Sequence, residues 1–594
     1  MLKKIIVNFF ERVEKLFVYF ILFLFPLFWL PFSFEVLELN KIYFLFFFSW
    51  LGVIFWILKG IIKERKIVFR YNFLDLIVFS FIFFAVFSFI FSKDRINSLF
   101  GTYLKFSDGL FSVFAFFGFY LLLRKALNLE NGEGVEIKTL FKVFFFSSFL
   151  ALFLTFLSLF NVWQKIPILK EKVPFSPIGV SIFSVSLFFA FTFVLFFNYL
   201  FLAEKIKKIE KYFLILFLVL SFILLFIFDF NISWFFIFIS FSFSFFVFAK
   251  EKIFGDKVHL FFVPIFLSIL SLFFIPLDIQ GLVFSFFPKT QNFFVSLPRE
   301  ILLSQEESFK VAFRSLTSSV KNIFFGSGPG TFFEDFALFK SKEFWNLRIS
   351  SPGNYFSQVL ANFGILGSLS FSLLLIFFLL IFVFKKIERE IFFLKSFFLS
   401  VFLLPFLFYQ NTIFSFLFWM GLAILANYVS SKQKIINLKE NQVFALFIET
   451  LSIILIITFI SFFVLGVRFY LADLNYKKGF IEEDSEKKIG FFERAVNFNP
   501  YQPYYKMALS QALLQKVLSE IQKENPDQNV ISQNGVLSIN FAKAAQDASK
   551  NNVLYKENLG VIYRELGMTE LSLASFQEAL SLEPKNAFFF FEIG

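Results

Sequence analysis

Residues 235–246, FFIFISFSFSFF, decide the class of fold to which this chain belongs. They are apolar or small, and they lie in an uncharged segment near 233–249 that approaches the length needed to cross a bilayer core of about 30 Å. Similar segments dominate the chain, in which 114 of 594 residues are Phe. Apolar residues make up 58% and charged residues 17%, against roughly 25% charged residues in soluble domains. We therefore exclude a soluble globular protein.

Apolar segments of spanning length predict an all-α polytopic membrane protein. The 13 predicted spans lie near 17–33, 40–58, 73–92, 109–123, 143–161, 179–200, 212–228, 233–249, 260–276, 365–384, 391–408, 412–429 and 443–466. Two long polar regions interrupt this pattern. The chain accordingly divides into the first nine spans (1–276), a large external loop (277–364), the last four spans (365–466) and an external tail (467–594).

The positive charge gathers on one set of loops between the predicted spans. Residues 467–594 hold 14 Lys and Arg against 16 Asp and Glu, so the net charge of +12 belongs to the membrane part. There, loops such as 59–70 and 205–211 are basic, and such loops face the cytoplasm in membrane proteins. We expect a multi-pass protein of the cytoplasmic (inner) membrane, with a cytoplasmic amino terminus and an external tail. A nucleic-acid partner is not expected, because little basic charge is left to bind one.

The composition also excludes several kinds of chemistry. The chain has no Cys, which rules out disulfides, thiolate catalysis and Cys metal ligands. Its single histidine, His259, falls at the cytoplasmic edge of a predicted span and cannot build a site of several imidazoles. Acidic runs such as 482–484 consist of adjacent residues, which point apart on a helix, so we expect neither a metal nor a cofactor. Scarce charge at mid-membrane positions argues against an ion-coupled transporter.

The tail carries a repeat pattern. In a unit beginning at Val553, positions 7, 8, 11, 24, 27 and 32 are Leu559, Gly560, Tyr563, Phe576, Ala579 and Pro584. This is the tetratricopeptide pattern of two antiparallel helices that stack on their neighbours. A further unit would begin at Ala587 and stop within its first helix, so we expect a truncated array. The tail is predicted to dock a peptide or assembly partner, and the alternative is a spacer.

The external loop contains a glycine-rich turn, GSGPGTF, at residues 326–332. Gly326, Gly328 and Gly330 favour a tight turn with exposed backbone N–H groups. Such a turn can hold an anionic group, although glycine turns are common in proteins of every kind. The loop continues to Asn354 and Tyr355 and then to GILG at 364–367, where a span begins.

These motifs resemble those of the O-antigen ligase and polymerase superfamily of membrane glycan transferases. The resemblance covers about residues 15–430 and is carried by residues 326–332, Asn354-Tyr355 and 364–367, together with the early external loop 100–109. The last span and the tail resemble a tetratricopeptide-bearing branch. The resemblance implies a GT-C-like helical fold that passes a glycan from a polyprenyl-diphosphate donor to a glycan, lipid or protein acceptor at the outer face, among membrane lipid.

Expulsion of a diphosphate requires cations, and bidentate Arg suits phosphate oxygens. Arg348 lies between the glycine turn and Asn354, and it is our first candidate for catalysis. Lys105 falls close to a position where the family often has a basic residue. Substrate-binding candidates are Lys105, Arg95, Arg299, Arg314, Gly326, Gly328, Gly330 and Tyr355. The alternative for Arg314 is a solvated helix face, and for Arg348 a stem packed beside Trp345 and Leu347.

The acceptor base is the main departure from the family, whose members commonly have His directly before the Asn that corresponds to Asn354. Here that position is Gly353. Three explanations stay open: Glu334 or Asp335 serves as the catalytic base, charge stabilisation suffices, or the protein is noncatalytic. Glu334 and Asp335 are equally compatible with plain surface charges. We expect Asn354 to orient the acceptor.

The sequence thus predicts a metal-independent membrane glycosyltransferase, either ligase or polymerase. Two alternatives remain: a noncatalytic membrane-anchored scaffold for envelope glycan assembly, and a transporter of lipid-linked glycan.

Overall fold

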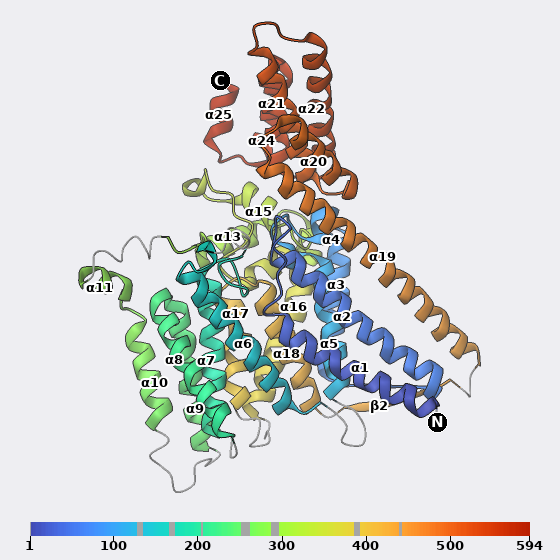
Figure 1. Ribbon diagram of the computed structural model, residues 1–594, viewed down its shortest axis with the longest axis vertical. Coiled ribbons are helices and arrows are strands. Elements are labelled where there is room, and N and C mark those ends of the chain that lie inside the picture. Colours follow the sequence, from blue (N-terminus) through green and yellow to red (C-terminus); the bar gives the residue numbers. More distant parts are fainter. Residues whose placement is uncertain are drawn as a thin grey trace.

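The structure is a computed structural model that describes residues 2–127, 135–165, 173–202, 206–250, 262–286, 296–384, 393–429, 431–438 and 442–594. His259 lies outside the described residues. Helices dominate, and they form one large bundle with a smaller helical tail at one end (Figure 1). Nine helices of the described chain are at least 18 residues long and apolar enough to cross a membrane, as in a multi-pass membrane protein.

Each predicted span overlaps one helix of the bundle. These helices are α1 (Leu2–Leu24), α2 (Glu38–Lys59), α3 (Phe73–Ile90), α5 (Leu110–Leu127), α6 (Ile137–Leu159), α7 (Ile182–Leu202), α8 (Lys208–Phe228), α9 (Asn231–Lys250), α10 (Phe262–Phe274), α16 (Tyr355–Phe384), α17 (Phe393–Leu407), α18 (Thr412–Tyr428) and α19 (Gln442–Ile481). Of these, α10, α17 and α18 are apolar but shorter than 18 residues, so the number of spans stays a prediction.

Several helix boundaries differ from the predicted ones, and three of them bear on the architecture. Helix α1 ends at Leu24, because Pro26 and Pro31 interrupt the apolar segment that follows. Helix α16 begins at Tyr355, but its backbone breaks at Gly364 (φ 66°, ψ −165°), next to the start of the predicted span. Helix α19 continues through the predicted boundary at 466 for a total of 40 residues and carries the chain into the tail.

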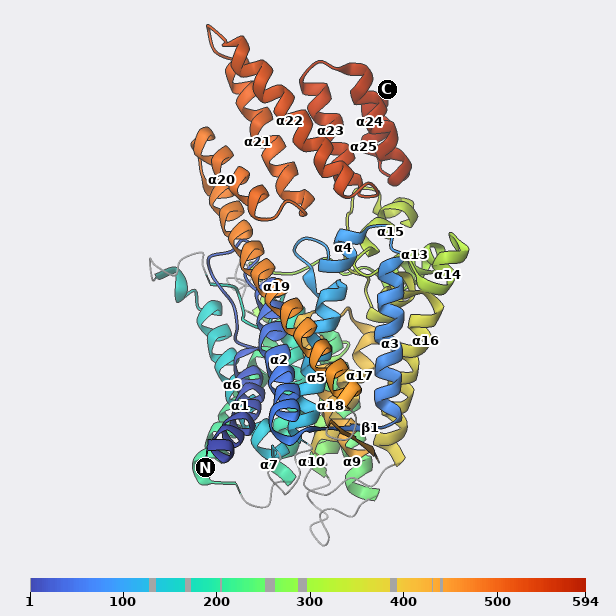
Figure 2. The same ribbon diagram turned by 90° about the vertical axis from the view of Figure 1, so that its right-hand side faces the viewer.

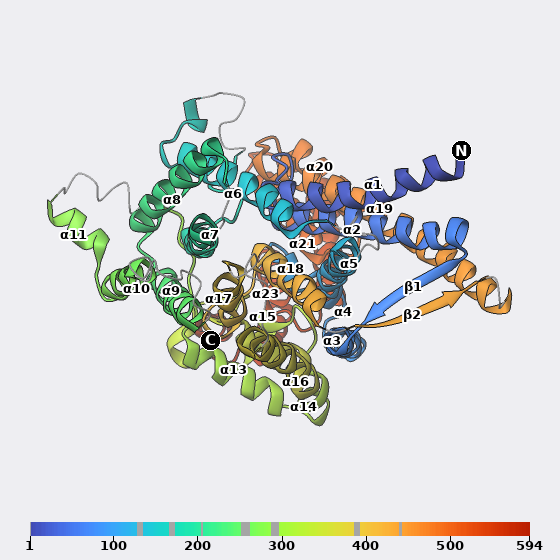
Figure 3. The same cartoon turned by 90° about the horizontal axis from the view of Figure 1, so that it is seen from below.

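The core of the bundle lies around α5, α7 and α18, whose side chains are mostly buried. Figure 3 shows α18 near the centre of the bundle and α8 and α10 at its edge. Helix α19 runs obliquely across α2 and α5 (Figure 2), and large apolar side chains along it, such as Phe447, are exposed. An apolar surface of this kind suits contact with lipid rather than water.

The end of the bundle opposite the tail carries a small β-ribbon. At the end opposite the tail, β1 (Lys66–Tyr71) and β2 (Lys432–Asn437) form an antiparallel ribbon in which Lys66 pairs with Asn437 and Tyr71 with Lys432 (Figure 1). This ribbon was not predicted, because its strands lie far apart in the sequence. The amino terminus lies at the same end. The predicted orientation places the basic loop 59–70, to which β1 belongs, on the cytoplasmic side.

Short helices cover the end of the bundle that faces the tail. They are α4 (Arg95–Phe100), α11 (Ile279–Phe286), α13 (Gln305–Thr317), α14 (Val320–Phe325), α15 (Phe332–Phe339) and the 3-10 turns η2 (Phe106–Asp108), η4 (Trp163–Lys165) and η7 (Lys342–Phe344). A π-helical turn, η1 (Gly60–Glu64), follows α2 at the other end.

The tail consists of helices that pack consecutively, α20 (Ser485–Phe498), α21 (Pro503–Ile521), α22 (Gln528–Ala548), α23 (Val553–Glu565), α24 (Thr569–Leu582) and α25 (Ala587–Ile593). The unit predicted from Val553 corresponds to the pair α23 and α24. A Cβ at Gly560 would lie 2.9 Å from the ring of Phe576, which explains the small residue there. The assignment of these helices as tetratricopeptide repeats stays a prediction.

Candidate functional site

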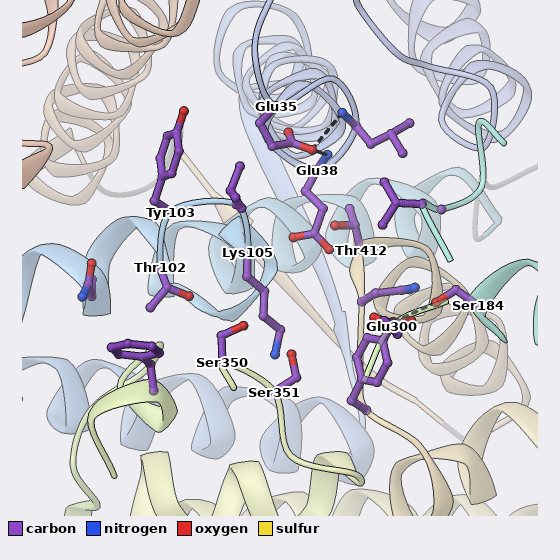
Figure 4. Close-up of a pocket in the computed structure, with 18 of the residues that line it drawn as sticks. Glu35, Glu38, Thr102, Tyr103, Lys105, Ser184, Glu300, Ser350, Ser351 and Thr412 are labelled. Carbon is purple, nitrogen blue, oxygen red and sulfur yellow. Dashed lines mark hydrogen bonds between the residues drawn. The ribbon is translucent and has the colours of Figure 1, made fainter. Parts of the chain in front are cut away.

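A cavity of about 400 Å³ lies where the bundle meets the tail. The loops before α2, α5, α7, α13, α16 and α18 line it from the bundle, and α21 and α23 line it from the tail. Figure 4 shows the charged and hydroxyl-bearing side chains that face it. The lining includes three carboxylates, Glu35, Glu38 and Glu300, and three basic residues, Lys41, Lys105 and Arg348.

Lys105 is a buried cation on the wall of this cavity. Its Nζ lies 2.7 Å from Asp108 Oδ2, and among the described residues the ammonium has no further hydrogen-bond partner. Burial raises the pKa of Asp108, and the nearby Lys105 opposes that rise. Figure 4 shows the Lys105 side chain reaching toward Ser350 and Ser351. An ammonium has three donors, so the Lys105 ion pair with Asp108 leaves hydrogen-bonding capacity at the cavity wall.

The loop that carries Lys105 is held by glycine. Gly101 has φ +88°, and a Cβ there would lie 2.7 Å from the carbonyl oxygen of Lys105. A Cβ at Gly109 would overlap the backbone N of Gly101. The motif at 100–109 thus folds back on itself at two positions that exclude a side chain, and this turn places Lys105 in the cavity.

Glu35 and Glu38 occupy the start of α2. Glu35 accepts hydrogen bonds from the backbone N–H groups of Leu37, Glu38 and Leu39 at 2.9, 2.9 and 2.7 Å, and so caps the helix. Burial, with a smaller effect from the Glu38 charge, raises the pKa of Glu35 to about 7. Glu38 Oε2 accepts hydrogen bonds from the N–H and the hydroxyl of Ser107 at 3.2 and 3.1 Å. Lys41 donates to the carbonyl oxygens of Pro26 and Pro177.

A second polar cluster on the cavity wall joins Glu300, Tyr409 and Ser184. The Tyr409 hydroxyl donates to Glu300 Oε1 at 2.5 Å and lies 2.9 Å from Ser184 Oγ. Burial raises the pKa of Glu300, while the Tyr409 hydrogen bond and the Lys105 charge oppose that rise. Lys105 Nζ lies 5.8 Å from the centre of the Tyr409 ring. The two polar clusters of the cavity therefore meet at Tyr409.

The tail closes the cavity on the side away from the bundle. Tyr504, Asn552, Leu554 and Tyr555 line it from α21, α23 and the residue before α23. The ring of Tyr103 stacks on Tyr504 with a centroid distance of 4.4 Å. The cavity as it stands is incomplete without the tail.

Arg348 lines the cavity, but its guanidinium is bound to the tail. Its NH2 lies 2.5 Å from Glu557 Oε2 and 2.7 Å from Glu583 Oε2, and its Nε donates to Glu583 as well. Burial lowers the pKa of Arg348, but Glu583 and Glu557 outweigh this effect and raise it. Glu583 also pairs with Lys340 at 2.5 Å, with both side chains fully buried. The Arg348 charge is thus neutralised by carboxylates in this structure.

Asn354 and Tyr355 hold the start of α16. Asn354 is fully buried, its Oδ1 accepts from the N–H of Ser357 at 2.7 Å, and its Nδ2 donates to Gln305 Oε1 at 2.5 Å. The backbone N–H of Tyr355 donates to the carbonyl oxygen of Phe408 at 3.0 Å. Neither residue lines the cavity. A Cβ at Gly353 would overlap the carbonyl oxygen of Leu303, so a histidine does not fit there.

Glu334 and Asp335 lie beneath the glycine turn, on α15. Asp335 pairs with Lys93 at 2.7 Å and accepts a hydrogen bond from Ser327 Oγ at 2.6 Å. Glu334 Oε1 accepts from the side chain of Asn97, a cavity residue, at 3.1 Å. Burial raises the pKa of Glu334 to about 7 against the opposing charge of Lys93. Both carboxylates are buried, not surface charges, and neither lines the cavity.

The glycine turn packs loops together. Gly326, Gly328 and Gly330 have φ values of +74°, +120° and +66°. A Cβ at Gly326 would overlap the backbone of Asn362, next to the break in α16, and one at Gly330 would lie 2.6 Å from the carbonyl oxygen of Asn97. Protein atoms thus occupy the space beside the three glycines, and the turn does not line the cavity.

The remaining cations predicted from the sequence lie outside the cavity lining and are exposed. Arg299 donates to Gln280 Oε1 at 2.5 Å, and Arg314 donates to the carbonyl oxygen of Phe339 at 2.9 Å. Arg95 is exposed in the first turn of α4. Of all the predicted site residues, the structure brings only Lys105 and Arg348 into the cavity lining.

Sequence reasoning missed Glu35, Glu38, Lys41, Glu300 and Tyr409 as cavity residues. A signal existed for the first three, since a charged cluster at 35–41 separates two apolar segments. The described ranges contain no group of three or more acidic or imidazole side chains placed to hold a metal ion. The fold places this chain among helical proteins that have many apolar helices of membrane-spanning length. Comparison with protein-family models and with curated proteins finds no match for this chain.

Proposed function

We propose that this protein transfers a glycan from a polyprenyl diphosphate to an acceptor, on the outer face of the cytoplasmic membrane. One observation carries the proposal: Lys105 is a buried cation on the wall of the cavity, and among the described residues its ammonium is paired with Asp108 alone. A buried ammonium with spare donors favours an anionic ligand such as a diphosphate. The resemblance of the loops 100–109 and 326–332 to membrane glycan transferases supports the same proposal.

The size and lining of the cavity support the proposal. Its volume of about 400 Å³ falls within the roughly 300–1,000 Å³ typical of small-molecule sites. In the proposed mechanism, Lys105 neutralises charge on the departing diphosphate, and the hydroxyl groups of Ser350 and Ser351 hydrogen-bond to the same group. The cavity lies between the bundle and the tail, and its buried charged groups interact more strongly than they would in open water.

A noncatalytic scaffold is the second candidate, and the pairing of Arg348 favours it. The cation predicted to bind the diphosphate is already bound by Glu557 and Glu583. In this alternative, the buried ion pairs serve to fix the tail on a membrane anchor.

The test is a transfer assay with the purified full-length chain in liposomes, using a labelled glycan on polyprenyl diphosphate. We expect diphosphate release that requires an acceptor, and a loss of about 10²- to 10³-fold in rate for Lys105→Ala. Lys310→Ala is the matched control, because Lys310 is an exposed lysine that pairs with Glu306 on α13.

Three results would overturn the proposal. Folded wild-type protein that transfers nothing from several donors would favour the scaffold. Movement of lipid-linked glycan across the liposome membrane with no acceptor present would favour a transporter. Equal rates for Lys105→Ala and Lys310→Ala would remove the cavity from the reaction.

A further inference from the structure

The cavity wall carries three carboxylates, and they differ in how their oxygens are engaged. Both oxygens of Glu35 accept backbone N–H groups and hold the first turn of α2. Glu38 accepts two bonds from Ser107 and so fixes the turn at η2 against α2. Glu35 and Glu38 thus have structural tasks that a change of protonation would disturb.

Glu300 is different, because its strongest partner is a hydroxyl group that itself lines the cavity. Tyr409 donates to Glu300 Oε1 at 2.5 Å, and Ser184, also a lining residue, lies 2.9 Å from the Tyr409 oxygen. The hydroxyl groups of Ser181 and Ser184 lie near Glu300 and favour its charged form, which opposes the rise in its pKa. A carboxylate supported by hydroxyl donors can accept a proton and keep its hydrogen-bond network, since hydroxyl groups both donate and accept.

The position of this cluster is fixed by rigid elements. Ser184 lies in the first turn of α7, and Tyr409 lies in the short connection between α17 and α18. The loop that carries Glu300 is attached to α7 by a hydrogen bond from the N–H of Ile182 to the carbonyl oxygen of Pro298 at 3.0 Å. Figure 4 shows Glu300 and Ser184 together on one side of the cavity, with the Lys105 side chain in the same cavity.

The geometry points to Glu300 as the group that takes the proton from an acceptor hydroxyl, with Tyr409 and Ser184 as its positioning residues. This inference rests on the proposed function. The acceptor oxygen forms a bond to the anomeric carbon as its proton passes to the Glu300 carboxylate. The bond between that carbon and the diphosphate oxygen breaks, and the diphosphate leaves with the electron pair beside Lys105. Glu300 then returns its proton to water.

The inference assigns the acceptor a class as well, namely one with a hydroxyl nucleophile. General-base assistance accelerates attack by a neutral hydroxyl by about 10²- to 10⁴-fold. The Lys105 ammonium lies near the Tyr409 ring and the Glu300 carboxylate accepts the Tyr409 hydroxyl, so the inference assigns the leaving diphosphate to the Lys105 side of this cluster and the acceptor to Glu300.

The experiment compares Glu300→Gln with Glu306→Gln in the liposome transfer assay. Glu306 is an exposed glutamate on α13 that pairs with Lys310, and it serves as the matched control. We expect Glu300→Gln to lower kcat by about 10²- to 10⁴-fold with an unchanged KM for the donor, and Glu300→Asp to recover part of the loss. Thermal unfolding of each variant shows whether it is folded.

The pH profile adds a readout that a merely structural role would not change. Groups that face Glu300 are Lys105, which favours its charged form, the Tyr409 phenol, and the hydroxyls of Ser181 and Ser184. Wild-type kcat should decrease at low pH as Glu300 becomes protonated, which gives the pH profile an acid limb. Glu300→Gln should abolish this acid limb. Tyr409→Phe removes a hydrogen bond that favours the carboxylate, so the limb should move to higher pH.

Failure of this inference is distinct from failure of the proposed function. A wild-type enzyme that transfers glycan, with a folded Glu300→Gln variant that retains its kcat and acid limb, would overturn the inference alone. Absence of transfer by the wild type would overturn the proposed function and the inference with it.

Discussion

The buried pair of Lys340 and Glu583 should control whether the tail stays docked on the bundle. Nζ and Oε1 lie 2.5 Å apart with both side chains inaccessible to solvent, and Glu583 also binds Arg348. Glu583→Ala leaves the buried Lys340 ammonium without its carboxylate, with the carbonyl oxygens of Trp345 and Leu347 as its remaining partners. Loss of one member of a buried pair costs about 3–5 kcal/mol, which corresponds to a decrease of about 10²- to 10⁴-fold in the ratio of docked to undocked tail.

Hydrogen exchange on the full-length protein measures this change directly. In Glu583→Ala we expect faster exchange in α23, α24 and the loop 340–351, while α7 and α18 in the bundle core keep their protection. The double variant Lys340→Met with Glu583→Leu should recover much of the protection, because it removes both buried charges. Unchanged exchange in Glu583→Ala would refute the reasoning. Glu592→Ala is a suitable control, since Glu592 pairs with the half-exposed Arg564 within the tail.

Three further predictions concern stability. Burial opposes ionisation of Glu583, but bonds from Arg348 and Lys340 outweigh it and lower its pKa, whereas burial lowers the pKa of Lys340. Because Glu583 has two cationic partners, we expect docking of the tail to be strongest above the ordinary glutamate pKa. Docking should weaken as the pH falls through the lower pKa that Glu583 has in the folded protein. Hydrogen exchange in α24 that does not change at acid pH would contradict this prediction. In thermal unfolding, Gly353→Ala should destabilise the protein by about 1–3 kcal/mol, because its Cβ would overlap Leu303. Gly490 has open space around it, so Gly490→Ala should stabilise the protein by up to about 1 kcal/mol. Equal unfolding midpoints for the two variants would count against this packing argument. Asp335→Ala should leave Lys93 without its carboxylate and cost about 3 kcal/mol in the same assay, and a loss below about 1 kcal/mol would contradict a tight attachment of the glycine turn.

The helices were predictable because apolarity is a local property of the sequence. Each of the predicted spans overlaps a helix, and the boundary near 365 coincides with the break at Gly364. The ribbon was not predictable in this way, because Lys66 pairs with Asn437 across most of the chain. The end of α1 could have been placed better, since Pro26 is visible in the sequence.

The cavity was predictable only in part. Lys105 stands between Gly101 and Gly109, whose spacing indicates a folded turn, and it does reach the cavity. The glycine turn at 326–332 shows the limit of such patterns. A glycine pattern indicates a backbone with positive φ. It does not indicate whether a ligand or the protein itself occupies the space beside the glycines, and here Asn362 and Ser92 occupy it.

Long-range partners account for the rest. Glu300, Tyr409 and Ser184 come from three segments, none of which carries a local motif. Arg348 was noticed for its place in the loop, but its partners Glu557 and Glu583 lie 209 and 235 residues further along the chain. No periodicity or spacing in one sequence connects residues that far apart.

The most direct test of the central claim is to locate the donor on the protein. A polyprenyl diphosphate with a photoreactive group beside the diphosphate would be irradiated with the full-length chain in liposomes, and labelled peptides would be identified by mass spectrometry. The account predicts labels in 102–108 and 348–351, competed by unlabelled donor and lost in Lys105→Ala. Labels confined to the lipid-facing helices α8 and α10, or unaffected by Lys105→Ala, would contradict it.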